Sequence, residues 1–201
     1  MIVIQFKILL FAKMTLLLYK DSRSKVWGTW QQNAPYLFKE KMISEYTNKA
    51  NSKILFVINN AAEKYKGIIP DNCWQEPYMS EQKLADEFKA GVRMFGYHNK
   101  NKLVGVIGIQ ETKEVVLIRH AYTLIHYQGK GAGSALLEFL LKKNQNSRLL
   151  VGTWKNATWA VRFYEKFGFI LQTKEDTTLL LKKYWNIPSE QIKNSVVLEK
   201  F

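Results

Sequence analysis

The sequence predicts a mixed α/β or α+β domain, and three observations support that prediction. From residue 42 onward, segments with apolar residues at helical spacing alternate with short strand-like segments bounded by turn residues. Three consecutive strand-like segments near the middle of the chain indicate an antiparallel meander. At 201 residues and 47% hydrophobic content, the chain is large enough to form one globular domain with an appendage.

The first half of this region supplies a strand and two helices. Residues 43–47 (ISEYT) are a strand candidate, and residues 51–65 place apolar side chains at helical spacing. After a loop rich in turn residues, Ser80 predicts the start of a helix that Gly91 ends. A strand followed by helices therefore precedes the meander.

The second half begins with the meander and continues with alternating helices and strands. The meander strands are predicted at 92–98, 102–110 and 114–124. Helices and strands then alternate along the chain, at 131–143 (helix), 148–154 (strand), 157–166 (helix), 169–173 (strand), 176–185 (helix) and 194–200 (strand).

Residues 1–41 differ from the rest and are predicted to be a basic, apolar and poorly ordered extension of a domain at 42–201. One glutamine and two lysines interrupt the apolar residues of 1–18, which therefore fall short of the roughly 20 residues that span a bilayer. The longest uninterrupted apolar run is also too short for a signal-peptide core. No membrane association is expected, and Met42 is an alternative start.

Charge and cysteine content narrow the function classes. The net charge of +13 favours an anionic partner, but the basic residues are spread along the chain, so no nucleic acid is expected. Cys73 is the only cysteine, which excludes an internal disulfide and indicates a reducing compartment, the cytoplasm. His98, His120 and His126 lack metal-ligand spacing, so no metal is expected.

A glycine-rich turn at residues 126–137 (HYQGKGAGSALL) lies between a predicted strand and a helix. The first turn of a helix has unpaired N–H groups and a partial positive charge, and glycines let an anion approach that backbone. The spacing of Gly129, Gly131 and Gly133 fits neither a dinucleotide-binding turn nor a P-loop. An anion site and a plain strand-to-helix connection remain as alternatives.

A second motif follows about 25 residues later, in the helix predicted within residues 156–170 (NATWAVRFYEKFGFI). Together the two motifs resemble the GCN5-related N-acetyltransferase (GNAT) superfamily over roughly residues 42–185. Its Q/R-x-x-G-x-G/A signature is matched by Gln128, Gly131 and Gly133. Its A-x-x-x-Y-E-K-x-G-F helix is matched by Ala160, Tyr164, Glu165, Lys166, Gly168 and Phe169.

The resemblance implies an acyl-CoA N-acyltransferase fold, with a central, mixed but mostly antiparallel twisted sheet flanked by helices, and acetyl-CoA as cosubstrate. It assigns the pyrophosphate to the turn residues Gln128, Gly129, Lys130, Gly131, Ala132, Gly133 and Ser134. It also implies that main-chain groups of Ala121, Tyr122 and Thr123, on a bulged strand, pair with the pantetheine arm. The family often has an Asn seven residues before the helix tyrosine, where this chain has Ala157, so the part played by the neighbouring Asn156 stays open.

Tyr164 is the predicted catalytic residue, because the family's tyrosine lies beside the thioester sulfur. Acetyl transfer needs a neutral amine, polarisation of the carbonyl and a proton for the departing thiolate. A phenol has a suitable pKa to give that proton, and the N–H of Thr123 is a candidate to bind the carbonyl oxygen. The alternative is that Tyr164 is a core aromatic.

The acceptor side is predicted from a strand and a loop. Strand alternation groups Arg119 with Ala121 and Thr123 and turns His120 to the opposite layer. By resemblance the Arg119 face borders the acceptor cleft, where the guanidinium would bind a carboxylate or phosphate. The alternative is an ion pair of Arg119 with Glu111 or Glu114.

The loop segment CWQEPYM makes Trp74, Glu76 and Tyr78 candidates for the acceptor wall, because the family usually places acceptor-recognising segments there. The alternative is a surface loop anchored by a buried tryptophan.

The expected function is N-acetyl transfer from acetyl-CoA to a primary amine of a small molecule, or of a peptide or protein, in a ternary complex. The expected partners are acetyl-CoA and that amine, and the expected state is a monomer or homodimer. A catalytically idle acyl-CoA-binding or nucleic-acid-associated module on the same fold is the alternative. The sequence does not identify the acceptor.

Overall fold

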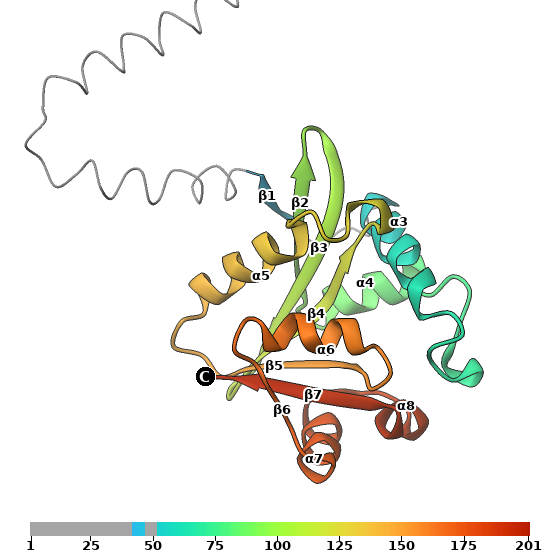
Figure 1. The fold of residues 1–201 in the computed structure, drawn as a ribbon, viewed down its shortest axis with the longest axis vertical. Coiled ribbons are helices and arrows are strands. Elements are labelled where there is room, and N and C mark those ends of the chain that lie inside the picture. Colours follow the sequence, from blue (N-terminus) through green and yellow to red (C-terminus); the bar gives the residue numbers. More distant parts are fainter. Residues whose placement is uncertain (1–41, 47–51) are drawn as a thin grey trace, which may run out of the picture. The chain divides into compact units, whose positions relative to one another are not determined.

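A computed structural model describes residues 42–46 and 52–201, and the predicted extension at 1–41 lies outside the described residues. The described residues contain a seven-stranded sheet with the order β1-β2-β3-β4-β5-β7-β6 (Figure 1). Its strands are β1 (Ile43–Tyr46), β2 (Arg93–Asn99), β3 (Lys102–Glu111), β4 (Val116–Thr123), β5 (Leu149–Trp154), β6 (Ile170–Leu171) and β7 (Ser195–Lys200).

Neighbouring strands are antiparallel except for β4 and β5, which run parallel. These two strands pair from Val116 opposite Leu149 to Ile118 opposite Val151, and beyond that point they diverge (Figure 1). The predicted meander is formed by β2, β3 and β4. The predicted fold class, a mixed but mostly antiparallel sheet flanked by helices, is confirmed.

The described helices are α3 (Ser52–Ala62), α4 (Glu81–Lys89), α5 (Ala132–Lys143), α6 (Thr158–Glu165), α7 (Lys174–Tyr184) and α8 (Ser189–Lys193). The sequence predicted all of them except α8. The predicted end signals of α4 are confirmed, since Ser80 Oγ accepts from Lys83 N–H at 3.2 Å and Gly91 adopts a φ of +88°. The strand predicted at 169–173 is shorter, with two residues paired to β7.

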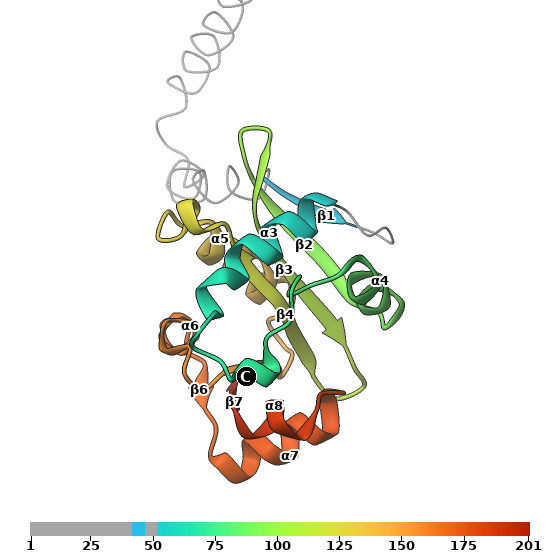
Figure 2. The same cartoon turned by 90° about the vertical axis from the view of Figure 1, so that its right-hand side faces the viewer.

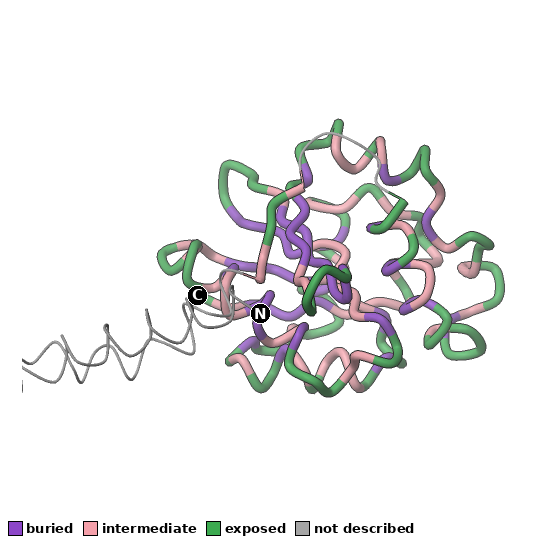
Figure 3. Tube along the Cα trace, turned by 90° about the horizontal axis from the view of Figure 1, so that it is seen from above, coloured by how far each residue is buried: buried purple, intermediate pink, exposed green. Residues whose placement is uncertain are grey.

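Helices cover both faces of the sheet and divide its core. On one face, α5 and α6 pack on β2, β3, β4, β5 and β7 in a core cluster that includes Ile118, Leu137, Val151 and Tyr164. On the other face, α3 and α4 cover the β2 to β4 half, whereas α7 and α8 cover the β5 and β7 half (Figure 2). In Figure 3 the buried residues gather in the interior, and the exposed residues lie along the outer turns. No helix in the described part of the chain is long and apolar enough to cross a bilayer.

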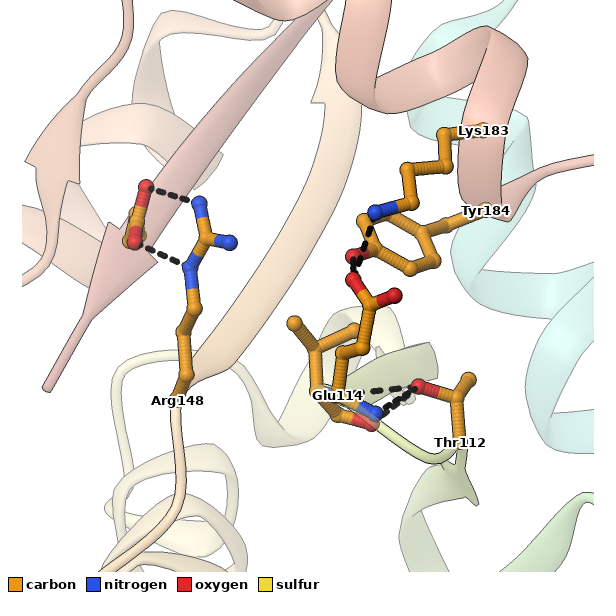
Figure 4. A network of polar contacts seen from close by, with 7 residues as sticks. Thr112, Glu114, Arg148, Lys183 and Tyr184 are labelled. Atoms are coloured by element: carbon orange, nitrogen blue, oxygen red, sulfur yellow. Dashed lines mark hydrogen bonds and ion pairs between the residues drawn. The ribbon is translucent and has the colours of Figure 1, made fainter.

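Polar contacts tie the turn between β3 and β4 to the end of α7 (Figure 4). The carboxylate of Glu114 accepts from Lys183 Nζ and from the Tyr184 hydroxyl, and the Thr112 hydroxyl closes the turn below it. These two donors lower the pKa of the Glu114 carboxyl. Nearby, Arg148, the residue before β5, binds Glu199 of β7 through two nitrogens, at 2.5 and 3.1 Å.

Candidate active site

A bulge in β4 sets the geometry of the site. Val106 pairs with Tyr122 and Gly108 pairs with Arg119, so one residue of β3 faces two residues of β4, His120 and Ala121. His120 takes a left-handed backbone conformation, with a φ of 49°. Because the extra residue breaks the strand alternation, the predicted grouping of Arg119 with Ala121 and Thr123 is wrong.

The glycine turn borders a cavity of about 510 Å³ between α5 and α6, here called the glycine-turn cavity. Gly129 and Gly131 adopt φ values of +72° and +88°, conformations that glycine tolerates best, and Gly131 caps α5. The cavity is also bordered by the predicted residues Ala121, Tyr122, Thr123, Gln128, Gly133, Ser134 and Tyr164. Lys130 and Ala132 belong to the turn but do not border the cavity.

The edge of β4 beside this cavity has main-chain groups turned away from the sheet. Leu124 N–H donates to Val104 O at 2.9 Å, so the alternation of an antiparallel ladder turns the Thr123 N–H to the opposite side. On that side β5 has already diverged. The side chain of Gln128 reaches the same edge, where Nε2 donates to Thr123 O at 3.1 Å.

Tyr164 projects from α6 into the core beside this cavity and is 5% exposed. Burial, with a smaller effect from Tyr65, raises the pKa of the Tyr164 phenol. The group therefore stays protonated at any pH where the protein would work. Tyr164 is thus both a core aromatic and a residue that borders the glycine-turn cavity.

Asn156 lies elsewhere. Its Nδ2 donates to Ile68 O at 3.3 Å, and it borders neither this cavity nor the one described next. Asn156 thus binds the loop that contains Ile68. The residue at the buried start of α6 is Ala157, which has no side-chain amide.

A second cavity, of about 590 Å³, lies on the opposite face of the sheet between the α3 and α4 half and the α7 and α8 half. It is called the Glu87 cavity here. Tyr65 and Tyr122 border both cavities. The two cavities therefore meet at these phenols, close to the point where β4 and β5 diverge.

Arg119 and His120 both border the Glu87 cavity, so the prediction that His120 faces the opposite layer is wrong. Arg119 Nη2 donates to both oxygens of Glu87 at 2.8 Å, and Nη1 donates to Gln110 Oε1 at 2.7 Å. The predicted partners of Arg119 are engaged elsewhere, since Glu111 binds Arg93 and Glu114 binds Lys183.

The loop residues predicted for the acceptor wall separate in the structure. Tyr78 borders the Glu87 cavity and accepts from Trp154 Nε1 at 3.3 Å. Trp74 packs under the loop, and its Nε1 is buried without a hydrogen-bond partner among the described residues. Glu76 is exposed and lies 3.7 Å from Lys66 Nζ. Trp74 and Glu76 thus have the contacts of a surface loop, whereas Tyr78 borders a cavity, and the acceptor-wall prediction is kept as a proposal for Tyr78.

Sequence reasoning missed Glu87, Tyr65 and Lys64. No local pattern links Glu87 to Arg119, which is 32 residues away. Lys64 Nζ lies 4.5 Å from the centre of the Trp159 ring and donates to Gln128 Oε1 at 3.3 Å, across the glycine-turn cavity. No group of three or more His, Cys, Asp or Glu side chains suited to a metal ion occurs among the described residues.

Comparison with known proteins decides the family, because residues 43–178 match the acetyltransferase (GNAT) domain. The chain belongs to the GNAT acetyltransferase family. Members of this family are acyl-CoA-dependent acyltransferases, and the glycine turn, the bulged strand and the tyrosine helix of this GNAT domain all fall within the matched residues.

One curated relative and two solved structures resemble the GNAT domain. UPF0157 protein YqkA of Bacillus subtilis (strain 168) is 29% identical over 126 residues, which are 60% of this chain and 36% of YqkA. The chain thus spans about a third of that relative's length.

The two solved structures share the fold. PaiA N-acetyltransferase from Thermoplasma acidophilum, in complex with coenzyme A, has a TM-score of 0.57 at 18% identity, covering 79% of this chain and 98% of that one. A GNAT acetyltransferase from Staphylococcus aureus Mu50 has a TM-score of 0.58 at 17% identity, covering 78% and 97%.

Proposed function

We propose that this GNAT domain transfers an acetyl group from acetyl-CoA to a primary amine of a small molecule or peptide, directly, in a ternary complex. The observation that carries the proposal is the pair of cavities on opposite faces of the sheet that share Tyr65 and Tyr122. One cavity has the family's cofactor motifs, and the other has a wall of charged and aromatic side chains. A thioester in the first would meet an amine in the second at the shared phenols.

The glycine turn and β4 would hold the cosubstrate. The N–H groups at the start of α5 would bind the pyrophosphate, with Lys64 and Lys166 as cations that border the same cavity. The main chain of β4 beyond Ile118 would pair with the pantetheine arm, because β5 has left that edge open. The Thr123 N–H would polarise the thioester carbonyl.

Tyr164 would supply the proton that the departing thiolate needs. Its phenol is kept protonated by burial and borders the cavity where the sulfur would lie. General acid catalysis of this kind contributes on the order of 100-fold to 10,000-fold in rate.

The Glu87 cavity suits a cationic amine with an apolar body. Its charged wall has three acidic residues (Asp86, Glu87, Glu190) and two basic residues (Lys83, Arg119), an excess of one negative charge. Tyr78, Trp154 and Trp185 add aromatic surface. An ammonium ion would enter such a cavity more readily than a carboxylate.

The test is acetyl-CoA binding by calorimetry, followed by release of free thiol across a panel of alkylamines, arylalkylamines, polyamines and peptide amines. We expect binding of acetyl-CoA and thiol release with at least one class of amine. Binding without release for every amine would favour the idle acyl-CoA-binding module instead.

We also propose that the catalytic domain begins at Met42. Its carbonyl accepts from His98 N–H at 2.8 Å, so the main chain of Met42 continues the pairing of β1 with β2. A chain that starts at Met42 should bind acetyl-CoA as the full chain does. A loss of affinity greater than about tenfold, or about 1.4 kcal/mol, would assign the extension a part in the site.

A further inference from the structure

We propose that His120 takes the proton from the acceptor's ammonium group, and that Glu87 positions the His120 imidazole for that step. The inference rests on the proposed function and adds the base that acetyl transfer to a protonated amine requires.

The backbone of β4 is bent to present this histidine. His120 is one of two described non-glycine residues with a positive φ, and it is the one that lies in the bulge. The bulge turns His120 to the same cavity as Arg119, whereas the next residue, Ala121, borders the glycine-turn cavity. His120 is therefore the residue next to Ala121, where the strand borders the cavity in which the thioester would lie. Backbone strain of this kind is concentrated at functional positions.

A carboxylate faces one nitrogen of the ring. His120 Nε2 lies 3.0 Å from Glu87 Oε2, and the imidazole is only 13% exposed. Nε2 is buried and makes no hydrogen bond of good angle with the described residues. A carboxylate beside Nε2 favours the tautomer with its proton on Nε2, so Nδ1 is the nitrogen that can accept another proton.

Glu87 is itself held in place. Arg119 grips both of its oxygens, Gln110 accepts from Arg119, and Gln110 Nε2 donates to Ala90 O at 2.8 Å. This chain of contacts joins α4 to β3 and β4. The carboxylate thus has a fixed position and can stabilise the imidazolium that forms when His120 takes a proton.

The charges around His120 are few. Glu87 of α4 contacts His120, and Arg119 of β4 contacts Glu87. Three further charged residues border the same cavity: Lys83 and Asp86 of α4 and Glu190 of α8. The charges of Arg119 and Glu87 neutralise each other. A positive charge on the His120 ring therefore meets no unpaired cation among these three residues.

The reaction balances with these groups. His120 removes one proton from the ammonium, and the neutral amine nitrogen forms a bond to the thioester carbonyl carbon. The carbon–sulfur bond then breaks, Tyr164 gives its proton to the thiolate, and the second proton on nitrogen returns to the Tyr164 oxygen through cleft water. The products are the amide and free thiol, and His120 releases its proton to solvent.

The experiment compares two kinds of acceptor in the full chain. His120→Asn keeps a residue that tolerates a left-handed φ but removes the base. We expect kcat/KM at about pH 7 to fall about 100-fold with an alkylamine, which is protonated, and less than about threefold with an arylamine or hydrazide of similar shape, which is neutral. Raising the pH toward about 9.5 should shrink the alkylamine defect, because more of that substrate is then neutral.

Control variants distinguish the loss of a catalytic base from structural damage caused by the substitution. His98→Asn, at a histidine that binds Tyr46 on a distant edge, should match the wild type on both acceptors. Glu87→Gln should give a smaller alkylamine defect of about tenfold with the same recovery at high pH. Thermal unfolding and acetyl-CoA binding report whether each variant is folded.

Each outcome decides between the two proposals. Equal losses on both acceptors, or none, in His120→Asn with an active wild type would overturn the base and leave acetyl transfer standing. Wild-type binding of acetyl-CoA without thiol release on any amine would overturn both.

Discussion

The guanidinium of Arg119 donates to both carboxylate oxygens of Glu87, each at 2.8 Å, across the gap between β4 and α4. Burial by itself would raise the pKa of the Glu87 carboxyl, but His120 and Arg119 together outweigh burial and hold that pKa below its usual value. Arg119 is therefore paired within the protein, and we propose that it fixes Glu87 rather than binding an anionic acceptor.

Arg119→Gln should lower the free energy of unfolding by about 2–4 kcal/mol, because it leaves the Glu87 carboxylate with a weaker partner in a mostly buried place. Adding Glu87→Gln in the Arg119→Gln background should cost less than Glu87→Gln alone, as urea unfolding of the double-mutant cycle would report. Strictly additive costs would mean that the pair is not coupled. Arg119→Gln should also slow a protonated alkylamine more than a neutral arylamine, because a displaced Glu87 positions His120 less well.

The same pair has a pH dependence with a definite sign. The pKa of Glu87 is lower in the folded protein than the value of about 4.3 in the unfolded chain, so its stabilisation is present above about pH 4.3 and is lost as the pH falls below it. The difference in urea midpoint between wild type and Arg119→Gln should therefore narrow toward about pH 3. A constant difference down to that pH would contradict the pairing.

Tyr164→Phe should reduce kcat about 100-fold while acetyl-CoA affinity stays within about threefold, because the substitution removes a proton donor and keeps the ring in the core. Tyr97→Phe, which removes a partly buried hydroxyl near Met42, is the matched control and should keep full turnover. Saturating acetyl-CoA separates chemistry from binding. Unchanged turnover by Tyr164→Phe across the pH range would leave this tyrosine a core aromatic only.

Gly131→Ala should weaken acetyl-CoA binding about tenfold or more, because alanine resists a φ of +88° by about 1–2 kcal/mol and the turn must change shape. Gly67→Ala tests the same kind of strain in a loop that borders neither cavity, with a φ of +74° and open space around the added methyl. Both variants should lose similar thermal stability, but calorimetry should show lost affinity only for Gly131→Ala. Equal affinities would mean that the turn tolerates another shape.

The glycine-turn cavity, which we propose holds the cosubstrate, has a geometry that could be predicted from sequence because its residues are close together along the chain. Gln128 to Ser134 form one strand-to-helix turn, and the glycine spacing that identifies it also gives it its backbone conformation. Tyr164 follows on one helix whose end Gly168 marks, with a φ of +80°. Around this cavity, local propensity and tertiary packing favour the same backbone conformation. A short sequence motif is therefore enough to predict the local structure.

The Glu87 cavity, which we propose takes the acceptor, could not be predicted in this way, because it depends on contacts between distant segments. The family resemblance implies a bulge in this strand but does not give its position, and the extra residue at His120 reverses the strand alternation. Glu87 comes from α4, and Tyr65 comes from the short 3₁₀ segment Glu63–Tyr65 after α3. These residues meet only because α3 and α4 pack on the same sheet half.

Stability should fall steeply at alkaline pH, because Tyr65, Tyr122 and Tyr164 meet around the junction of the two cavities as neutral phenols. Burial is the main cause that raises the pKa of each, and neighbouring phenols add to it. The folded protein keeps these protons above about pH 10, whereas the unfolded chain releases them, so the free energy of unfolding decreases as the pH rises. Each phenol contributes up to about 1.4 kcal/mol per pH unit. Urea midpoints between about pH 9 and 11 should show this decline, and Tyr122→Phe should reduce its slope by about a third; a flat profile would mean that the phenols ionise as readily in the folded state as in the unfolded one.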